Sequence, residues 1–239
     1  MPPGHRLLLA LLAALLLCLL VAGLLAPRAV GGGALALQLG DVMAVCRVLH
    51  DDPVIRVVEN FMTPAECEEL VLHYAGTLQP STVADDLDNT INRPNPNRTS
   101  WSAFLPAGRA GDLVERVERR AVALTGKPLR HMETLQLVRY EPPGQHYAPH
   151  FDFFHNDPES QRTVTCFVYL STLDEAPTRF TQLGLDVLPR QGWACVWDNC
   201  PAHGRGQRCD RRLEHAGMPV RTATKHGLNI WFRSLPFRT

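Results

Sequence analysis

The sequence has no excess of charge of either sign. Lys and Arg total 24 and Asp and Glu total 24, so the formal net charge is zero. Binding to nucleic acid through phosphate contacts needs an excess of basic residues. We therefore expect no nucleic-acid partner.

The chain also lacks the length for two large domains, and it has no internal repeat. Its 239 residues suit one domain with a sizeable core. Residues 7–26 form an uncharged apolar run, about the 20 residues that a helix needs to cross a bilayer. A cleavable signal peptide usually has an apolar region of about 7–15 residues, so residues 1–26 are predicted to be an uncleaved signal anchor. Cleavage near the small residues 31–36 is the alternative.

A leader of this kind sends the following domain into the secretory pathway. We expect a single-pass type II protein of the endoplasmic reticulum or Golgi membrane with its main domain in the lumen, or a secreted protein if the leader is cut. No retrieval tetrapeptide ends the chain. Residues 27–50 have no clear period and are predicted to be a linker, so that the domain covers residues 51–239.

Helix patterns precede strand patterns in this domain. Residues 54–61 form an apolar strand pattern, and a capping box of Thr63 and Glu66 predicts a helix to residue 74. Residues 81–100 are predicted to form a loop, and a second helix is expected over residues 111–125, ended by Gly126. Short strand patterns follow at residues 133–140, 163–170, 185–189, 193–197 and 228–233. The predicted class is α+β, with helices that buttress a β sandwich or barrel.

Six cysteines follow the leader, which is compatible with an oxidising compartment. Cys200 and Cys209 flank a polar loop and are the best candidates for a disulfide. Cys166 and Cys195 lie in apolar strand patterns, so the alternative to further disulfides is that they are buried free thiols.

The stretch GQHYAPHFDFF places His150 and Asp152 two residues apart. On a strand, positions i and i+2 face the same way, so both side chains can reach one metal ion. Two His and one carboxylate on one face of Fe(II) leave three positions open. Candidates for the second imidazole are His155, His203, His215 and His226.

These motifs carry a family resemblance. The segments RYEPPGQHYAPHFDFF, HAGMPVRTATK and NIWFR resemble, in order and spacing, the catalytic domain of the collagen-type prolyl 4-hydroxylases. These enzymes are Fe(II)- and 2-oxoglutarate-dependent oxygenases. The resemblance covers roughly Asp51 to the end of the chain, including VIRVVENFMTPAECEELV and RTSWSAFL.

The resemblance implies a double-stranded β-helix, or jelly roll, with His150, Asp152 and His215 as iron ligands. By the same residue-by-residue matching, Lys225 binds the distal carboxylate of 2-oxoglutarate, and an ammonium is a compact charge suited to that task. The hydroxyls of two further residues, Tyr140 and Thr178, match positions that bind the same carboxylate.

Substrate residues are implied in the same way. Tyr147, Arg162 and Trp231 fall where the family grips its peptide, and aromatic faces suit a polyproline II chain. The implied reaction is C4 hydroxylation of peptidyl proline with O2 and 2-oxoglutarate, releasing succinate and CO2, with L-ascorbate as reductant. We expect a proline-rich or collagen-like substrate and a monomer or weak dimer, because a separate peptide-binding domain is lacking.

Departures from the family pattern motivate two other functions. The doubled proline Pro142-Pro143 and the replacement of a Gly-Gly turn by EAPTRF, residues 175–180, suggest a membrane-tethered peptide-binding module with an inactive site. Met218 and Arg233 also replace common family residues. Lysyl hydroxylation is a further alternative, but related lysyl enzymes generally have Arg where this chain has Lys225.

A structural zinc site is the main rival for the metal. Cys200, His203, Cys209 and His215 form a series of soft ligands. Such a site would leave His150, Asp152 and Lys225 without a role, and the two cysteines are better placed to form a disulfide.

Overall fold

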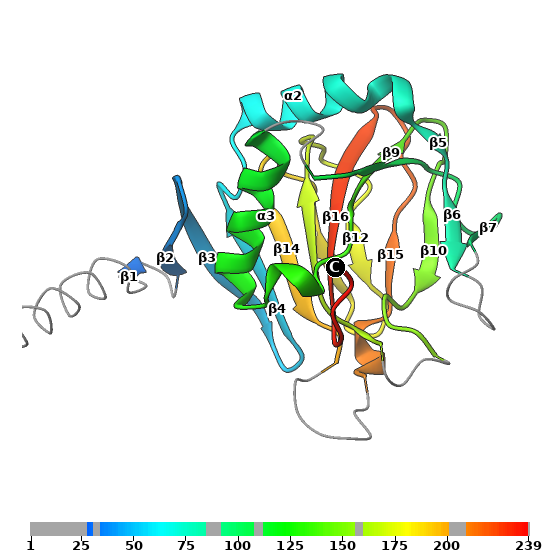
Figure 1. Ribbon diagram of the computed structural model, residues 1–239. Coiled ribbons are helices and arrows are strands. Elements are labelled where there is room, and N and C mark those ends of the chain that lie inside the picture. Colours follow the sequence, from blue (N-terminus) through cyan, green and yellow to red (C-terminus); the bar gives the residue numbers. More distant parts are fainter. Residues whose placement is uncertain are drawn as a thin grey trace, which may run out of the picture.

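The computed structural model describes residues 28–30, 34–84, 92–107, 112–155, 160–200 and 209–238 (Figure 1). The predicted signal anchor over residues 1–26 lies outside these ranges. None of the helices in the described ranges is long and apolar enough to cross a membrane.

Two α-helices and a series of antiparallel strands make up the described domain. The helices are α2 (Pro64–Tyr74) and α3 (Asp112–Thr125). The strands are β1 (Arg28–Val30), β2 (Ala34–Leu39), β3 (Val42–Asp51), β4 (Val54–Glu59), β5 (Gln79–Pro80), β6 (Thr82–Ala84), β7 (Asn92–Pro94), β8 (Trp101–Leu105), β9 (Leu135–Tyr140), β10 (Tyr147–His150), β11 (Arg162–Tyr169), β12 (Thr178–Phe180), β13 (Leu185–Val187), β14 (Ala194–Asp198), β15 (His215–Gly217) and β16 (Lys225–Arg233).

The strands form a large sheet, a smaller sheet and a short hairpin. The large sheet has the order β1-β2-β3-β4-β14-β11-β16-β9-β8-β5, the smaller one the order β10-β15-β12-β13, and β6 pairs with β7. Helices α2 and α3 cover the outer face of the large sheet (Figure 1). This α+β arrangement of antiparallel sheets confirms the predicted class and is typical of a double-stranded β-helix.

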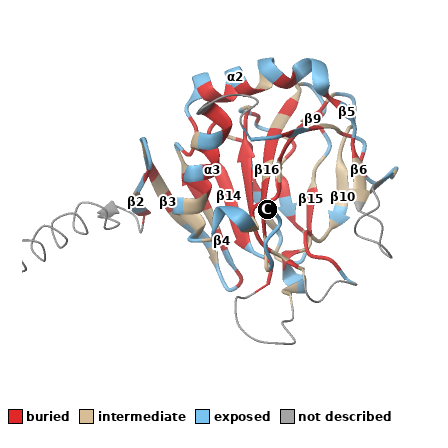
Figure 2. Ribbon diagram, in the orientation of Figure 1, coloured by how far each residue is buried: buried red, intermediate tan, exposed pale blue. Residues whose placement is uncertain are grey.

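Strand β11 shows how the large sheet is buried on both faces. Val164, Cys166 and Val168 pack in the cluster under the helices, whereas Phe167 and Tyr169 pack in a second cluster between the two sheets. Successive side chains on a strand point to opposite faces, so a strand with apolar side chains on both faces contributes to two cores at once. Figure 2 shows the same central strands as buried.

The predicted helices are confirmed, with their end signals. Thr63 accepts a hydrogen bond from the Glu66 backbone N–H, and the Glu66 carboxylate accepts one from the Thr63 N–H, which completes the capping box. Helix α3 ends before Gly126, whose φ of 67° is the left-handed conformation expected of a C-terminal glycine. Arg120 of α3 joins the helices to the sheet, because its guanidinium pairs with Glu66 and Asp41.

The prediction of a linker over residues 27–50 is wrong for residues 34–50. Strands β2 and β3 pair from Leu35↔Cys46 to Leu39↔Val42, and β3 continues the large sheet by pairing with β4. Gly40 and Asp41 form the two-residue connection, and Gly40 has the positive φ that such hairpins need. Small residues around this hairpin hide its alternating pattern in the sequence.

The predicted loop over residues 81–100 contains the short hairpin of β6 and β7. Residues 85–91, between these strands, lie outside the described ranges. The hairpin stands beside β10, at the edge where the smaller sheet faces the cleft described below (Figure 1).

Candidate active site

The smaller sheet brings two imidazoles together. His150 is the last residue of β10 and pairs with His215, the first residue of β15. Asp152 lies in the bend that follows β10, not on the strand itself as the i, i+2 argument assumed. One donor atom from each of the three side chains lies within 4.8 Å of the other two. The candidate third ligand that the structure selects is therefore His215.

Backbone carbonyls fix both imidazoles with the same orientation. Nδ1 of His150 donates to the Ala148 carbonyl at 2.8 Å, and Nδ1 of His215 donates to the Leu213 carbonyl at 2.9 Å. A carbonyl can only accept, so each Nδ1 carries a proton, and the Nε2 atoms, which face Asp152, are the ones left to bind a metal. Burial, with a contribution from His215, lowers the pKa of His150 to about 3, which keeps that ring neutral.

A chain of hydrogen bonds holds the carboxylate. Trp197 donates its indole N–H to Asn199, whose amide donates to the hydroxyl of Thr165, and Thr165 donates to Oδ2 of Asp152 at 2.6 Å. Burial by itself would raise the pKa of Asp152, but nearby His215 and positive charge keep it below its usual value. The carboxylate is thus ionised and oriented before any metal binds.

The donor set fits Fe(II). Two imidazoles and one carboxylate form the facial triad of non-haem Fe(II) oxygenases, and each ligand has an outer partner that fixes it. Sequence reasoning missed Thr165, Asn199 and Trp197. Only the pairing of β11 with β14 and β16 brings them to the metal side of the sheet.

A buried ammonium lines the same cavity. Lys225 is the first residue of β16, pairs with Tyr140 of β9 and is 1% exposed. Its Nζ donates to the Ala176 carbonyl at 2.7 Å, and among the described residues no carboxylate pairs with it. Three aromatic rings, those of Tyr140, Phe167 and Tyr169, surround Nζ at 5.7–5.8 Å.

Burial lowers the pKa of Lys225 to about 7. A buried cation without a counter-ion needs an anion, and a carboxylate of a small ligand beside the metal meets that need. The residues present therefore fit a dicarboxylate co-substrate such as 2-oxoglutarate.

Tyr140 and Thr178 also line this cavity, with the metal ligands and Lys225. The Thr178 hydroxyl is hydrogen-bonded to the Tyr169 phenol at 2.9 Å, and the phenol also lies 3.2 Å from the Val187 carbonyl, which can only accept. The doubled proline at 142–143 does not remove Tyr140 from the cavity. In the altered turn, Ala176 takes a left-handed φ of 52°, a conformation that favours glycine.

A larger cleft of about 840 Å³ adjoins the metal ligands. The three predicted substrate residues line it. Tyr147 stacks on the ring of His150 with centroids 3.5 Å apart, and the Arg162 guanidinium lies over the Trp231 ring at 3.8 Å. The indole N–H of Trp231 is buried and has no acceptor among the described residues.

Two further charged residues, Glu133 and Arg233, line the cleft; the sequence marked Arg233 only as a departure from the family pattern and did not mark Glu133. Glu133 is buried and accepts hydrogen bonds from Arg162 at 2.7 and 2.8 Å and from Arg233. Burial opposes ionisation of Glu133, but the two guanidinium groups keep its pKa below the usual value. No local pattern signals this cluster, because 29 residues separate Glu133 from Arg162 and 100 separate it from Arg233.

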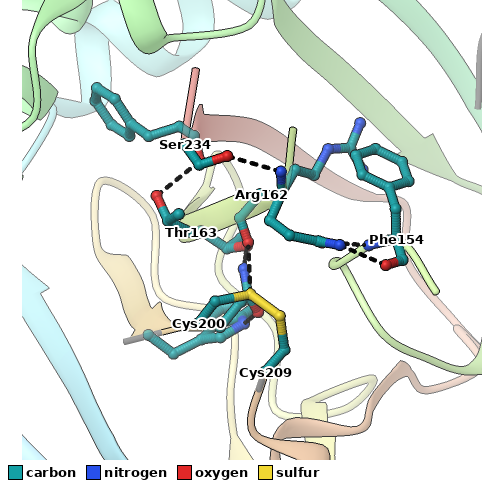
Figure 3. Close-up of a disulfide and its surroundings, with 11 residues drawn as sticks. Phe154, Arg162, Thr163, Cys200, Cys209 and Ser234 are labelled. Carbon is teal, nitrogen blue, oxygen red and sulfur yellow. Dashed lines mark hydrogen bonds between the residues drawn. A yellow bond between two sulfur atoms is a disulfide. The ribbon is translucent and has the colours of Figure 1, made fainter. Parts of the chain in front are cut away.

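The predicted disulfide between Cys200 and Cys209 is present (Figure 3). It lies beside the start of β11, where the Cys200 N–H donates to the Thr163 carbonyl. Both thiols are thus unavailable to zinc, and His203 lies outside the described residues, so the rival zinc site is not formed. Cys166 and Cys195 are free and buried, as the alternative for them predicted.

Comparisons with known proteins agree with this site. A model of the 2OG-Fe(II) oxygenase superfamily matches residues 135–233. Probable prolyl 4-hydroxylase 10 of Arabidopsis thaliana is 34% identical over 78% of this chain and 71% of its own length. Prolyl 4-hydroxylase subunit alpha-1 of Homo sapiens is 30% identical over 76% of this chain but only 34% of its own length.

The matched part of each plant relative is close to two thirds of that relative's own length. The match to Probable prolyl 4-hydroxylase 7 of Arabidopsis thaliana, at 28% identity, spans 64% of that protein. Among solved structures, the viral collagen prolyl hydroxylase of Paramecium bursaria Chlorella virus-1, in its 2OG complex, superposes with a TM-score of 0.61 at 22% identity, over 76% of this chain and 96% of that one. This likeness shows the fold.

Proposed function

The chain belongs to the prolyl 4-hydroxylase family of the 2-oxoglutarate- and Fe(II)-dependent dioxygenases, and on this premise we propose that it hydroxylates peptidyl proline at C4. One observation carries the proposal. The His150, Asp152 and His215 triad lines one cavity with the buried Lys225, which has no carboxylate partner in the described part of the chain, and this cavity adjoins a peptide-sized cleft.

The cavity residues would divide the work as follows. His150, Asp152 and His215 hold the metal, Lys225 closes an ion pair on the distal carboxylate of 2-oxoglutarate, and Tyr140 and Thr178 supply hydroxyl groups beside it. When bound, Fe(II) would activate O2, which is the oxidant, and 2-oxoglutarate would supply two electrons as it is converted to succinate and CO2; no side chain of this protein provides this chemistry. The chain orients the reactants and keeps the cavity dry.

The cleft residues would position the peptide. A polyproline II chain presents a carbonyl at every turn, and the buried Trp231 N–H needs an acceptor. The ring of Tyr147 and the Arg162 guanidinium stacked on Trp231 give flat walls against which proline rings can pack. An unsatisfied donor in the cleft supports a peptide ligand more than a purely structural role.

The full chain should be incubated with Fe(II), 2-oxoglutarate and three peptides: polyproline, a Ser-Pro-rich peptide and a Pro-Pro-Gly repeat. We expect a mass gain of one oxygen atom on proline, with an equal amount of succinate. Asp152→Ala should abolish both, whereas Asp186→Ala, on the exposed Arg179 pair, should not. Peptide binding without succinate would instead support the inactive binding module, and hydroxylation of a lysine peptide alone would support the lysyl alternative.

We propose the remaining features as expectations of the same assignment. L-Ascorbate would serve as reductant, and residues 1–26 would anchor a monomer or weak dimer with its catalytic domain in the lumen of the endoplasmic reticulum or Golgi. The disulfide of Cys200 and Cys209 is consistent with an oxidising compartment. Protease protection of the domain in intact microsomes, lost on detergent addition, would test this placement.

A further inference from the structure

The cleft wall on the side of β16 and β11 carries more positive charge than the described residues neutralise. Arg162 and Arg233 share the one carboxylate of Glu133. Arg98, also in the cleft, donates to two neutral acceptors, the Thr82 carbonyl and the Gln136 side chain, and has no carboxylate partner among the described residues. The other carboxylate of the described cleft lining is Asp152, which is a metal ligand.

Both guanidinium groups on Glu133 retain unused donors. Arg233 donates from Nε to Glu133 and from Nη1 to Ser160, and its Nη2 has no acceptor in the described part of the chain. Arg162 donates from Nε and Nη2, so its Nη1 is similarly unused. These N–H groups face a cleft and are largely shielded from water, since the two side chains are only 18% and 12% exposed. A ligand with a negative group would satisfy them.

Aromatic rings hold the two guanidinium groups in place. Arg162 lies between Trp231, at 3.8 Å, and Phe154, at 5.0 Å. Arg233 lies over Phe154 at 4.4 Å and over Phe237 at 5.4 Å. Arginines that already lie over aromatic rings and pair with Glu133 lose little further freedom when they bind a carboxylate, so the wall is preorganised for an anion.

We propose that this cleft selects proline peptides that carry an aspartate or glutamate side chain near the target proline, and that Arg233 determines this specificity. The inference rests on the proposed function and narrows its substrate class. Trp231 and Arg233 are two residues apart on β16, which is about 7 Å along a strand. A polyproline II chain rises about 3.1 Å per residue, so the acidic residue should lie about two positions from the target proline.

Peptide pairs that differ in one side chain test the proposal. Each pair has Glu or the isosteric Gln two positions before or after a central proline. Hydroxylation by the full-length enzyme is measured as kcat/KM, and binding to the Fe(II)- and 2-oxoglutarate-loaded enzyme is measured without O2. A charge-assisted hydrogen bond predicts about a tenfold preference for Glu over Gln at one of the two positions, mainly in KM, and a smaller preference at high salt.

Variants assign the preference to its residue. Arg233→Gln should bring the Glu-to-Gln ratio close to one, Arg233→Lys should retain part of it, and Arg221→Gln, which removes an exposed charge outside the cleft, should leave it unchanged. A purely structural role for Arg233 would weaken both peptides equally and keep the ratio.

Equal affinities for Glu and Gln peptides in the natural protein, or a ratio unchanged in Arg233→Gln, would overturn the inference. The proposed function is judged separately. Hydroxylation of the neutral peptides supports that function whatever the Glu-to-Gln preference is. If no peptide is hydroxylated, the binding measurement still gives the Glu-to-Gln affinity ratio and so tests the inference.

Discussion

The metal cavity and the peptide cleft adjoin each other, but they differ in how many of their polar side-chain groups have a hydrogen-bond partner within the protein. In the cavity, each imidazole donates to a carbonyl and Asp152 accepts from Thr165. In the cleft, the Trp231 indole and part of the Arg233 guanidinium have no partner among the described residues. Lys225 is the exception within the cavity, with a single neutral acceptor.

The difference separates groups that must be fixed from groups that must bind. Metal ligands gain from partners that orient them before the ion arrives. Groups that recognise a ligand keep unused donors, because leaving a buried donor unpaired costs about 1–3 kcal/mol that ligand binding recovers. This criterion supports the proposal that Lys225, Trp231 and Arg233 contact ligands, whereas Thr165 and Asn199 hold the carboxylate of Asp152 in place.

The largest expected effect is the pH dependence of 2-oxoglutarate binding. Lys225 has a pKa of about 7 in the ligand-free protein, so above that pH the co-substrate must bind together with a proton. We expect its affinity to fall about 50-fold from pH 7 to pH 9. Lys225→Arg, which stays charged, should flatten the profile. Calorimetry in buffers of different ionisation enthalpy would detect the proton uptake, and a pH-independent affinity would mean that Lys225 is already charged.

The next largest effect should come from the support of the carboxylate. Thr165→Val removes the hydroxyl that holds Asp152 and should weaken metal affinity about 10- to 100-fold. Thr163→Val is the matched control, because the Thr163 hydroxyl is equally buried but donates to the Phe232 carbonyl. Titration with Fe(II) or Co(II) compares the two variants. Equal losses in both would show that stability, not ligand orientation, sets the affinity.

A smaller effect is expected in the cleft. Trp231→Phe keeps most of the stacking on Arg162 but removes the indole N–H, which should raise the KM for a proline peptide about fivefold, the equivalent of about 1 kcal/mol. The KM for 2-oxoglutarate should stay the same. A change in the KM for 2-oxoglutarate alone would show that the indole N–H binds the co-substrate and not the peptide.

The smallest effect concerns the turn that positions Lys225. Ala176 has a φ of 52°, a conformation that is strained for alanine but not for glycine. Relief of this strain in Ala176→Gly should stabilise the fold by about 1 kcal/mol, and the larger entropy that glycine loses on folding should reduce that gain. Thermal unfolding measures the gain, with Ala148→Gly on β10 as a control that should destabilise. A loss of stability in Ala176→Gly would show that the turn is unstrained. The result bears directly on whether the altered turn impairs the site.

Several features could be predicted from short stretches of sequence. The capping box of α2, the apolar period of α3 and the Gly126 end signal depend on contacts within a few residues. The spacing of His150 and Asp152 suggested a shared metal, but the assignment depended on the family resemblance of the whole ordered motif, and the carboxylate lies beyond the strand end. The hairpin of β2 and β3 was missed, because small residues give little contrast between its two faces.

The sequence by itself determined the ligand types, the helices and the central strands β4, β9, β11, β14 and β16 of the large sheet, since these follow from side-chain chemistry and local backbone preference. Tertiary structure decided which distant groups meet. Strand register brings Thr165 to Asp152, the Ala176 carbonyl to Lys225, and one buried carboxylate to two arginines. Register is set by packing over the whole of both sheets, and a shift of one residue turns every side chain to the other face, so no local pattern contains that information.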